Sequence, residues 1–269
     1  MSDSEDNGIF GVSEDLVPPA VIKSAGVSEV DFDGLLSPPL KLQEDLKNGC
    51  GGQLWPAGMV LSKYMLRKHK DDLEGKEVYY SLILLGVIHP SDVFSALSLV
   101  RGVDSLGMPS FPTFLLVLRR CCFVFCCQHG QLTNFHSLAV ALGCRTNTTL
   151  HITDQLPMYE LMKQNITLNH LESKVSATIY DWGMPTPSGL PRHPDVILAA
   201  DCVYFEPAFP LLQETLKDLI GENTVCYFCF KKRRRADLQF MKVAKKMFDV
   251  KEVEDDPDKE VYSRQSLFL

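Results

Sequence analysis

Residues Asp195–Ala200 are DVILAA, a run in which every residue after the first is apolar. Strands that are buried on both faces, as in the centre of a parallel sheet, have this continuous apolar character instead of an alternating pattern. The run ends at Asp201, and open α/β sheets bind their ligands just beyond the carboxyl ends of such strands. The stretch therefore predicts a central parallel strand whose carboxyl end carries function.

On either side of this run, predicted strands alternate with predicted helices. Further strands are expected at Thr148–Thr153, Val175–Tyr180 and Thr224–Phe230, and helices at Gln53–His69, Met158–Leu171, Phe209–Ile220 and Ala236–Phe248. Near the end of the chain, Val250–Val253 and Tyr262–Phe268 bracket an acidic turn, which is typical of an antiparallel hairpin. The alternation predicts an α/β fold with a doubly wound, mostly parallel sheet and a C-terminal antiparallel hairpin.

Two segments depart from this pattern. Residues 1–39 are acidic and rich in Ser, Gly and Pro, so we expect a flexible leader before a domain at residues 40–269. Residues 79–136 keep neither a helical nor a strand period, and Arg119 and Arg120 interrupt their longest apolar stretch, which argues against a membrane span. We interpret residues 79–136 as an atypical insert, either retained non-coding sequence or a lineage-specific insertion.

The composition excludes several classes of protein. Hydrophobic residues make up 45% and charged residues 23%, with a net charge of −7, which suits a globular protein and argues against a dedicated nucleic-acid binder. The nine cysteines are an odd number, and the acidic, polar residues Met1–Phe10 do not resemble a signal peptide. We therefore expect reduced thiols in a cytosolic or nuclear compartment, and of the two we prefer a cytoplasmic location. Cys226 and Cys229 lie within a predicted strand, so we interpret them as structural thiols and expect no metal site.

Polar or aromatic residues follow three of the predicted strands. Asp154 ends one strand, where a carboxylate can accept hydrogen bonds from the hydroxyls of a cofactor ribose. Trp182, after Asp181, can lie against an adenine ring, and Asp201 follows the central run. Each residue alone is also consistent with a turn, a helix cap or a core-covering side chain. Together they predict a cofactor site at the carboxyl edge of the sheet.

Five segments together resemble the seven-β-strand, family-16 protein-lysine methyltransferases, especially the fungal type that acts on translation elongation factor one-alpha. They are QLWPAGMVLSKYM (Gln53–Met65), HITD (His151–Asp154), YDWG (Tyr180–Gly183), LAADCVYFEPAF (Leu198–Phe209) and CYFCFKKRRRAD (Cys226–Asp237). The resemblance implies a Rossmann-like, seven-stranded sheet, S-adenosyl-L-methionine as the cofactor and a protein substrate. We also expect a monomer with neither a membrane nor a nucleic acid as partner, in line with the charge and the interrupted apolar stretch.

The resemblance also implies roles for individual residues. Trp55 is similar to the residue that closes over the cofactor, Asp154 to the ribose ligand and Trp182 to the adenine-facing residue. Ala200 is similar to the small residue that lets the cofactor approach the strand end. Asp201 and Tyr204 match the family's Asp-x-x-Tyr motif beside the transferable methyl group. Asp201 would either relay a proton or orient the lysine amine.

The sequence departs from this family at one place and carries one feature that the motifs leave open. The family's glycine-rich turn after the first strand is missing, since the chain runs from Val78 into the atypical insert. This leaves two alternatives to a lysine methyltransferase: a catalytically dead binding protein of the same fold, and a methyltransferase for a different nucleophile. The basic run Lys231–Arg235 is either a solvated corner, a nuclear address or, as we prefer, a grip on an acidic substrate surface.

Overall fold

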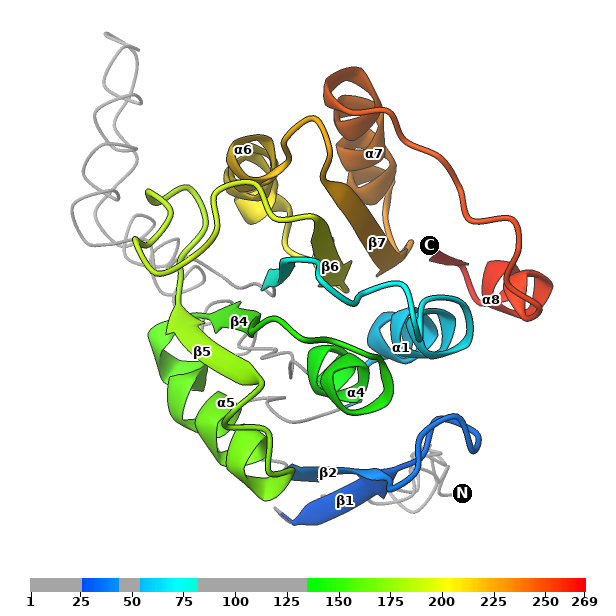
Figure 1. Cartoon of the computed structure of the whole chain (residues 1–269). Coiled ribbons are helices and arrows are strands. Elements are labelled where there is room, and N and C mark those ends of the chain that lie inside the picture. The colour runs from blue at the N-terminus through cyan, green and yellow to red at the C-terminus, as the bar shows by residue number, and fades with distance from the viewer. Residues whose placement is uncertain (1–25, 44–53, 82–134) are drawn as a thin grey trace, which may run out of the picture.

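The computed structural model describes residues 26–43, 54–81 and 135–269. In this part of the chain, six strands form one sheet in the order β5-β4-β3-β6-β7-β8 (Figure 1). The strands are β3 (Val78–Ser81), β4 (Leu150–Asp154), β5 (Val175–Ile179), β6 (Val196–Ala200), β7 (Val225–Lys231) and β8 (Leu267–Phe268). Every neighbouring pair is parallel except β7 and β8, which are antiparallel. The predicted α/β class with a mostly parallel sheet is confirmed, and the described residues supply six of the seven strands implied by the resemblance.

The DVILAA run occupies the centre of the sheet as predicted. All five residues of β6 are buried, because β6 pairs with β3 on one side and with β7 on the other. The register places Val78 beside Val196, and Ala200 beside Cys229. This arrangement brings the carboxyl ends of β4, β5, β6 and β7 to one edge of the sheet.

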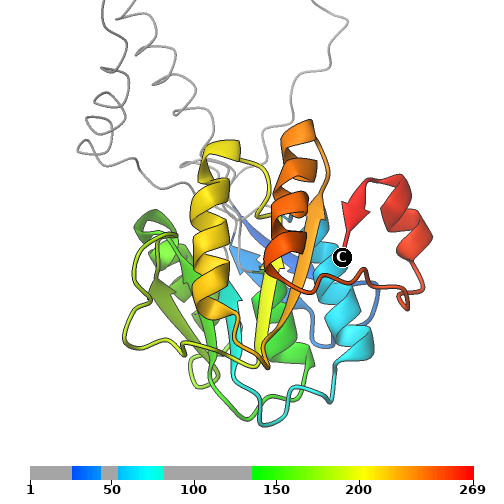
Figure 2. The same ribbon diagram turned by 90° about the horizontal axis from the view of Figure 1, so that it is seen from above.

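Helices cover both faces of the sheet. The cartoon shows α1 (Pro56–Lys68), α4 (Phe135–Gly143) and α5 (Leu156–Leu168) on one face (Figure 1). The other face carries α6 (Phe209–Leu219), preceded by the short helix η2 (Glu206–Ala208), and α7 (Arg235–Met247) (Figure 2). Helix α1 begins at Pro56, in the first-turn position where proline costs no hydrogen bond. The extended backbone of Trp55 precedes it, so Trp55 lies at the helix N-terminus.

The boundary predicted for the flexible leader is wrong. Residues 26–39 include strand β1 (Val27–Val30), which pairs antiparallel with β2 (Leu40–Gln43) in a separate two-stranded sheet. Phe32 and Leu36, between the two strands, are 1% and 3% exposed because they pack into the main core. The rest of the predicted leader, residues 1–25, lies outside the described residues.

The predicted bounds of the insert also need correction at both ends. Tyr79 belongs to β3, where it is fully buried and pairs with His151 on one side and Ile197 on the other. At the other end, α4 begins at Phe135 and therefore includes His136. The apolar residues of β3 are followed directly by more apolar sequence, so the sequence does not show where β3 ends. For this reason the predicted insert begins too early. Residues 82–134 lie outside the described residues.

The predicted C-terminal hairpin is wrong in its pairing. Residues 250–256 form no strand, and helix α8 (Lys259–Arg264) takes up the first three residues of the predicted second strand. Strand β8 pairs instead with the free edge of β7, and Phe268 stacks on Phe230 with ring centroids 5.7 Å apart. The acidic segment is held by ion pairs from Arg67 of α1 to Asp256 and Asp258, at 3.3 Å and 2.7 Å.

Candidate functional site

The sheet topology gathers the predicted site residues at its carboxyl edge. Asp154 is the last residue of β4, Trp182 lies three residues beyond β5, and Ala200 ends β6. Asp201 and Tyr204 follow β6 directly. Trp55 and Trp182 both pack in the hydrophobic cluster that contains Cys202. Residues from four separate parts of the chain therefore meet around the end of β6.

Asp154 is a buried carboxylate with spare hydrogen-bonding capacity. It is 1% exposed, and its Oδ1 accepts a hydrogen bond from the backbone amide of Gln155 at 2.7 Å. Its Oδ2 is buried without a hydrogen-bond partner among the described residues. Burial raises the pKa of Asp154. Because buried polar atoms in native proteins nearly always have partners, this oxygen marks a place where a ligand hydroxyl can donate.

Two further buried donors, one of them on Tyr204 near Asp154, are also unsatisfied in the described structure. The Tyr204 hydroxyl and the indole Nε1 of Trp55 have no hydrogen-bond partner there. Burial raises the pKa of Tyr204, and the nearby Asp154 carboxylate adds to the rise, so the hydroxyl stays protonated. An acceptor and two donors, all buried, make a polar lining suited to a polar ligand.

Trp182 and Ala200 are more enclosed than Trp55. Trp182 is 8% exposed and packs in the cluster that includes Leu212 of α6, while Ala200 is 2% exposed. Gly183 follows with a positive φ of 73°, and its amide donates to Thr215 Oγ1 of α6 at 2.9 Å. The turn after β5 is thus tied to α6, and this fixes the place of the indole.

Asp201 uses both of its carboxylate oxygens within the protein. Oδ2 accepts from the backbone amide of Ala57 at the start of α1, and Oδ1 accepts from Arg233 Nη2, both at 3.1 Å. The residue is 2% exposed. Burial raises the pKa of Asp201, while Arg233 and the Ala57 amide oppose the rise. These contacts favour an anchoring role for Asp201 over proton relay.

Sequence reasoning missed the role of Arg233. In sequence the run Lys231–Arg235 is a uniform basic stretch, but in the structure its cations have different partners. Lys232 lies 5.5 Å from the centre of the Phe268 ring, and Arg234 donates to the backbone carbonyl of Tyr204 and pairs with Asp237. A usable signal existed: Lys231–Arg235 follows a predicted parallel strand, so it lies at the same carboxyl edge of the sheet as Asp201. The preferred interpretation as a substrate grip is weakened, because three of the five cations bind within the molecule.

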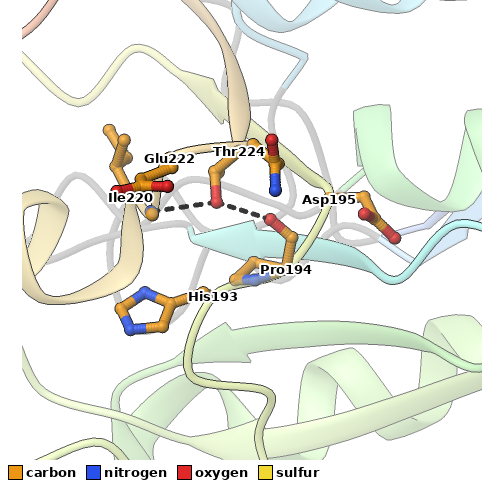
Figure 3. Close-up of a pocket in the computed structure, with 8 residues that line it drawn as sticks. His193, Pro194, Asp195, Ile220, Glu222 and Thr224 are labelled. Carbon is orange, nitrogen blue, oxygen red and sulfur yellow. Dashed lines mark hydrogen bonds between the residues drawn. The ribbon is translucent and has the colours of Figure 1, made fainter.

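The opposite edge of the sheet holds a hollow of about 570 Å³. Its walls are His193–Asp195, before β6, and Ile220–Thr224, before β7 (Figure 3). Thr224 Oγ1 donates to the carbonyl of Pro194 and accepts from the amide of Gly221, which braces the two turns (Figure 3). Because it lies at the amino ends of the strands, this hollow is separate from all the predicted site residues.

Within the described ranges, no group of three or more His, Cys, Asp or Glu side chains is placed to hold a metal ion. The same ranges contain no helix with the length and apolar character needed to cross a membrane.

Comparison with known proteins identifies the family. A family model described as lysine methyltransferase matches residues 35–87 and 133–247. The chain is 32% identical to protein-lysine N-methyltransferase EFM6 of Saccharomyces cerevisiae over 97% of this chain and 96% of that protein. It is 32% identical to protein N-lysine methyltransferase METTL21A of Mus musculus over 46% of this chain and 57% of that protein. On the strength of the family match and of a relative aligned along almost its whole length, this chain belongs to the lysine methyltransferase family.

Proposed function

We propose that this protein transfers a methyl group from S-adenosyl-L-methionine to a lysine side chain of a protein, with translation elongation factor one-alpha as the substrate. Membership of the lysine methyltransferase family supports the reaction. The motif resemblance described above supports the substrate. The single observation that carries the site assignment is the buried Asp154 carboxylate with one free oxygen at the end of β4.

The described residues fit S-adenosyl-L-methionine. Its ribose offers hydroxyl donors for the free Oδ2 of Asp154, and its carboxylate and ring nitrogens offer acceptors for buried donors. Trp55 and Trp182 supply aromatic surface in the hydrophobic cluster beside the end of β6. Ala200 adds only a methyl group at the end of β6, which leaves room for the cofactor to approach the backbone.

When bound, the cofactor supplies an electrophilic methyl group on a sulfonium. A lysine amine attacks only when neutral, and its ordinary pKa is near 10.4, so the site must favour the uncharged form. Apolar surroundings do so, and Cys202 and Val203, the two middle residues of the motif, are buried. The protonated Tyr204 hydroxyl can accept a hydrogen bond from the amine and orient its lone pair. Asp201, with both oxygens engaged, holds the surrounding segments in place.

The proposal is tested by isothermal titration with S-adenosyl-L-methionine and by methylation of purified elongation factor one-alpha, read by mass spectrometry of its lysines. We expect binding and transfer by the parent chain, and loss of both in Asp154→Ala, which removes the free acceptor. Binding without transfer to any protein in a cell lysate would contradict the proposed reaction.

A non-catalytic binding protein is the rival that one observation favours. The glycine-rich turn that its relatives' fold uses for the cofactor is missing from the sequence after β3. A parent chain that neither binds the cofactor nor transfers methyl groups, together with a variant in which a restored glycine-rich turn regains both, would favour this rival. If the assay instead yields a methylated small molecule or nucleic acid, the protein is a methyltransferase for a different nucleophile.

We also propose that the protein is a cytoplasmic monomer. The cysteines of the described ranges, Cys144, Cys202, Cys226 and Cys229, are all free, which suits a reducing compartment. Size-exclusion chromatography with light scattering and imaging of a tagged protein test the two parts of this proposal.

A further inference from the structure

Asp201 lies at the junction of three segments that are distant in sequence. Its backbone has a positive φ of 53°, a region that non-glycine residues rarely adopt, and its amide donates to the carbonyl of Cys229 in β7. Its side chain joins the N-terminus of α1, through Ala57, to the segment after β7, through Arg233. A strained residue with every polar atom of its side chain engaged is held in place by its surroundings.

Two arginines of the basic run hold the two ends of the Asp-x-x-Tyr motif. Arg233 donates to the side chain of Asp201, the first residue of the motif. Arg234 donates to the backbone carbonyl of Tyr204, the last residue, and is itself fixed by the buried Asp237. The side chain of Arg233 is 30% exposed and that of Asp201 is 2% exposed. The arginine therefore compensates the charge of a carboxylate that has almost no contact with solvent.

Arg233 and Asp201 form a clamp on the start of the motif. The contact between Asp201 and Ala57 extends this clamp to the segment that carries Trp55. The amide of Ala57 is one of the first helical N–H groups of α1, which have no partner within the helix. A carboxylate at this position satisfies the amide and interacts favourably with the positive end of the helix dipole. Trp55 lies two residues before Ala57, so the direction of its indole depends on how the first turn of α1 is held.

We propose that Arg233 is a positioning residue for the reaction proposed above: by holding the Asp201 carboxylate in place, it fixes the first turn of α1, and with it Trp55, against the end of β6. This inference rests on the proposed function for its kinetic consequence, but not for its structural one. Arg233 touches none of the atoms that react. It acts through Asp201 and Ala57 on Trp55, which packs in the cluster at the end of β6.

The structural consequence can be measured without activity, because Trp55 and Trp182 are the two tryptophans of the chain. In a Trp182→Phe background, tryptophan fluorescence reports on Trp55 alone. We expect Arg233→Met to raise the acrylamide quenching constant of Trp55 about twofold or more, since the first turn of α1 loses its anchor. Arg235→Met is the matched control, because Arg235 is exposed and forms no ion pair with any described residue. We expect this control to leave the quenching constant unchanged.

The kinetic consequence is measured with Trp182 restored. Arg233→Met should lower kcat/KM for methyl transfer about tenfold, the scale of one charge-assisted hydrogen bond, and Arg233→Lys should recover part of the loss. A thermal unfolding curve for each variant confirms that it is folded. If Arg233→Met does not fold, Arg233→Lys carries the test, with a smaller rise in quenching expected.

The outcomes separate the two proposals. Unchanged quenching of Trp55 in a folded Arg233 variant, or an equal change in Arg235→Met, overturns the positioning role whatever the activity. A parent chain without methyl transfer overturns the proposed function, while raised quenching in Arg233→Met still supports the clamp.

Discussion

Gly183 combines a backbone requirement with a packing requirement directly beside Trp182. Its φ is +73°, and a Cβ added there would lie 2.7 Å from Leu211 Cδ2. We expect Gly183→Ala to lower the free energy of unfolding by about 1–2 kcal/mol from the backbone conformation alone. Urea unfolding measures this loss. Gly189→Ala is the control, since its Cβ would meet no atom within 4 Å, and an equal loss there would contradict the explanation.

We expect the Asp154 carboxylate to lower the stability of the folded protein and to strengthen cofactor binding. Burial raises its pKa in the folded protein, so the folded state binds this proton more tightly than the unfolded state does. The free energy of unfolding therefore falls as the pH rises from about 4, the unfolded value, through the raised folded value. We expect Asp154→Asn to remove this loss, so that the variant gains stability relative to the parent as the pH increases.

The same Asp154→Asn variant should bind S-adenosyl-L-methionine about tenfold or more weakly, because a hydrogen bond to a charged group contributes about 1.5–3 kcal/mol. Urea unfolding at pH 5 and pH 8 and isothermal titration measure the two effects. Asp249→Asn, an exposed control, should change neither. A variant that is less stable than the parent at pH 8 would show that Asp154 has a structural partner.

For single residues, the position at a strand end can be predicted from the sequence, but the contacts of the side chain cannot. Asp154 and Asp201 could be placed at strand ends, because an apolar run followed by a charged residue is a local signal. The contact between Asp201 and Arg233 joins residues from two different strand ends, and no local pattern separates Arg233 from its four basic neighbours. The free oxygen of Asp154 is likewise a property of the folded surroundings.

At the level of elements, two asparagines attach the β1–β2 sheet to the main domain. Asn165 of α5 accepts from the amide of Gln43 at 2.7 Å, and Asn169, just beyond the helix, donates to the carbonyl of Lys41 at 2.7 Å. They bind the edge of β2 as a neighbouring strand would. The sequence carried no sign of this, because asparagine at a helix end is usually a cap or a turn residue.

We expect Asn165→Ala to lower the free energy of unfolding by about 1–3 kcal/mol, since it leaves part-buried backbone groups of Gln43 without partners. Asn169→Ala should cost about 0.5–1.5 kcal/mol, because its bonds to Lys41 are exposed to water. Hydrogen exchange of the Lys41 and Gln43 amides should speed up more than that of amides in β6. Lys163→Ala, on the exposed side of the same helix, is the control. Unchanged exchange at Lys41 and Gln43 would mean that apolar packing alone holds the small sheet.

Other elements could be predicted to within a few residues. The strands β4 to β7 and the helices α5 to α7 follow the expected ranges, because each has a clear period and a charged or proline-containing boundary. The C-terminal segment failed because β8 has only two residues and its partner is β7, far back in the chain. A strand as short as β8 pairs with whichever strand of the sheet has a free edge. The sequence alone does not show which strand that is.

At the scale of the whole molecule, the family match leaves out residues 88–132. Part of this segment, Phe111–Cys127, is apolar without a regular period, and such sequence promotes aggregation when it is exposed. We expect replacement of residues 88–132 by a short glycine-rich turn to raise the soluble yield and the affinity for S-adenosyl-L-methionine together. Soluble yield and isothermal titration measure these effects.

The bounds of this replacement matter, since β3 and α4 must be kept. A longer replacement, of residues 79–137, would remove three residues of the central strand and the start of α4, and we expect it not to fold. If the parent chain is as soluble, binds the cofactor as tightly and transfers methyl groups as well as the shortened chain does, the segment does not impair the protein and the prediction is wrong.

The central position of β3 also sets the order in which the protein can assemble during synthesis. The hydrogen bonds at the foot of β3 reach partners 72 and 118 residues further on, from Lys76 to Thr148 and from Glu77 to Asp195. The β1–β2 hairpin can close as soon as it leaves the ribosome, but β3 must wait with its apolar faces exposed until β4 and then β6 emerge. Such late pairing makes folding slow and exposes the nascent chain to misassembly. Ribosome-bound chains that stop before Asp195 should therefore remain sensitive to protease at β3 and bind chaperones, and protection should appear only once β6 has been translated.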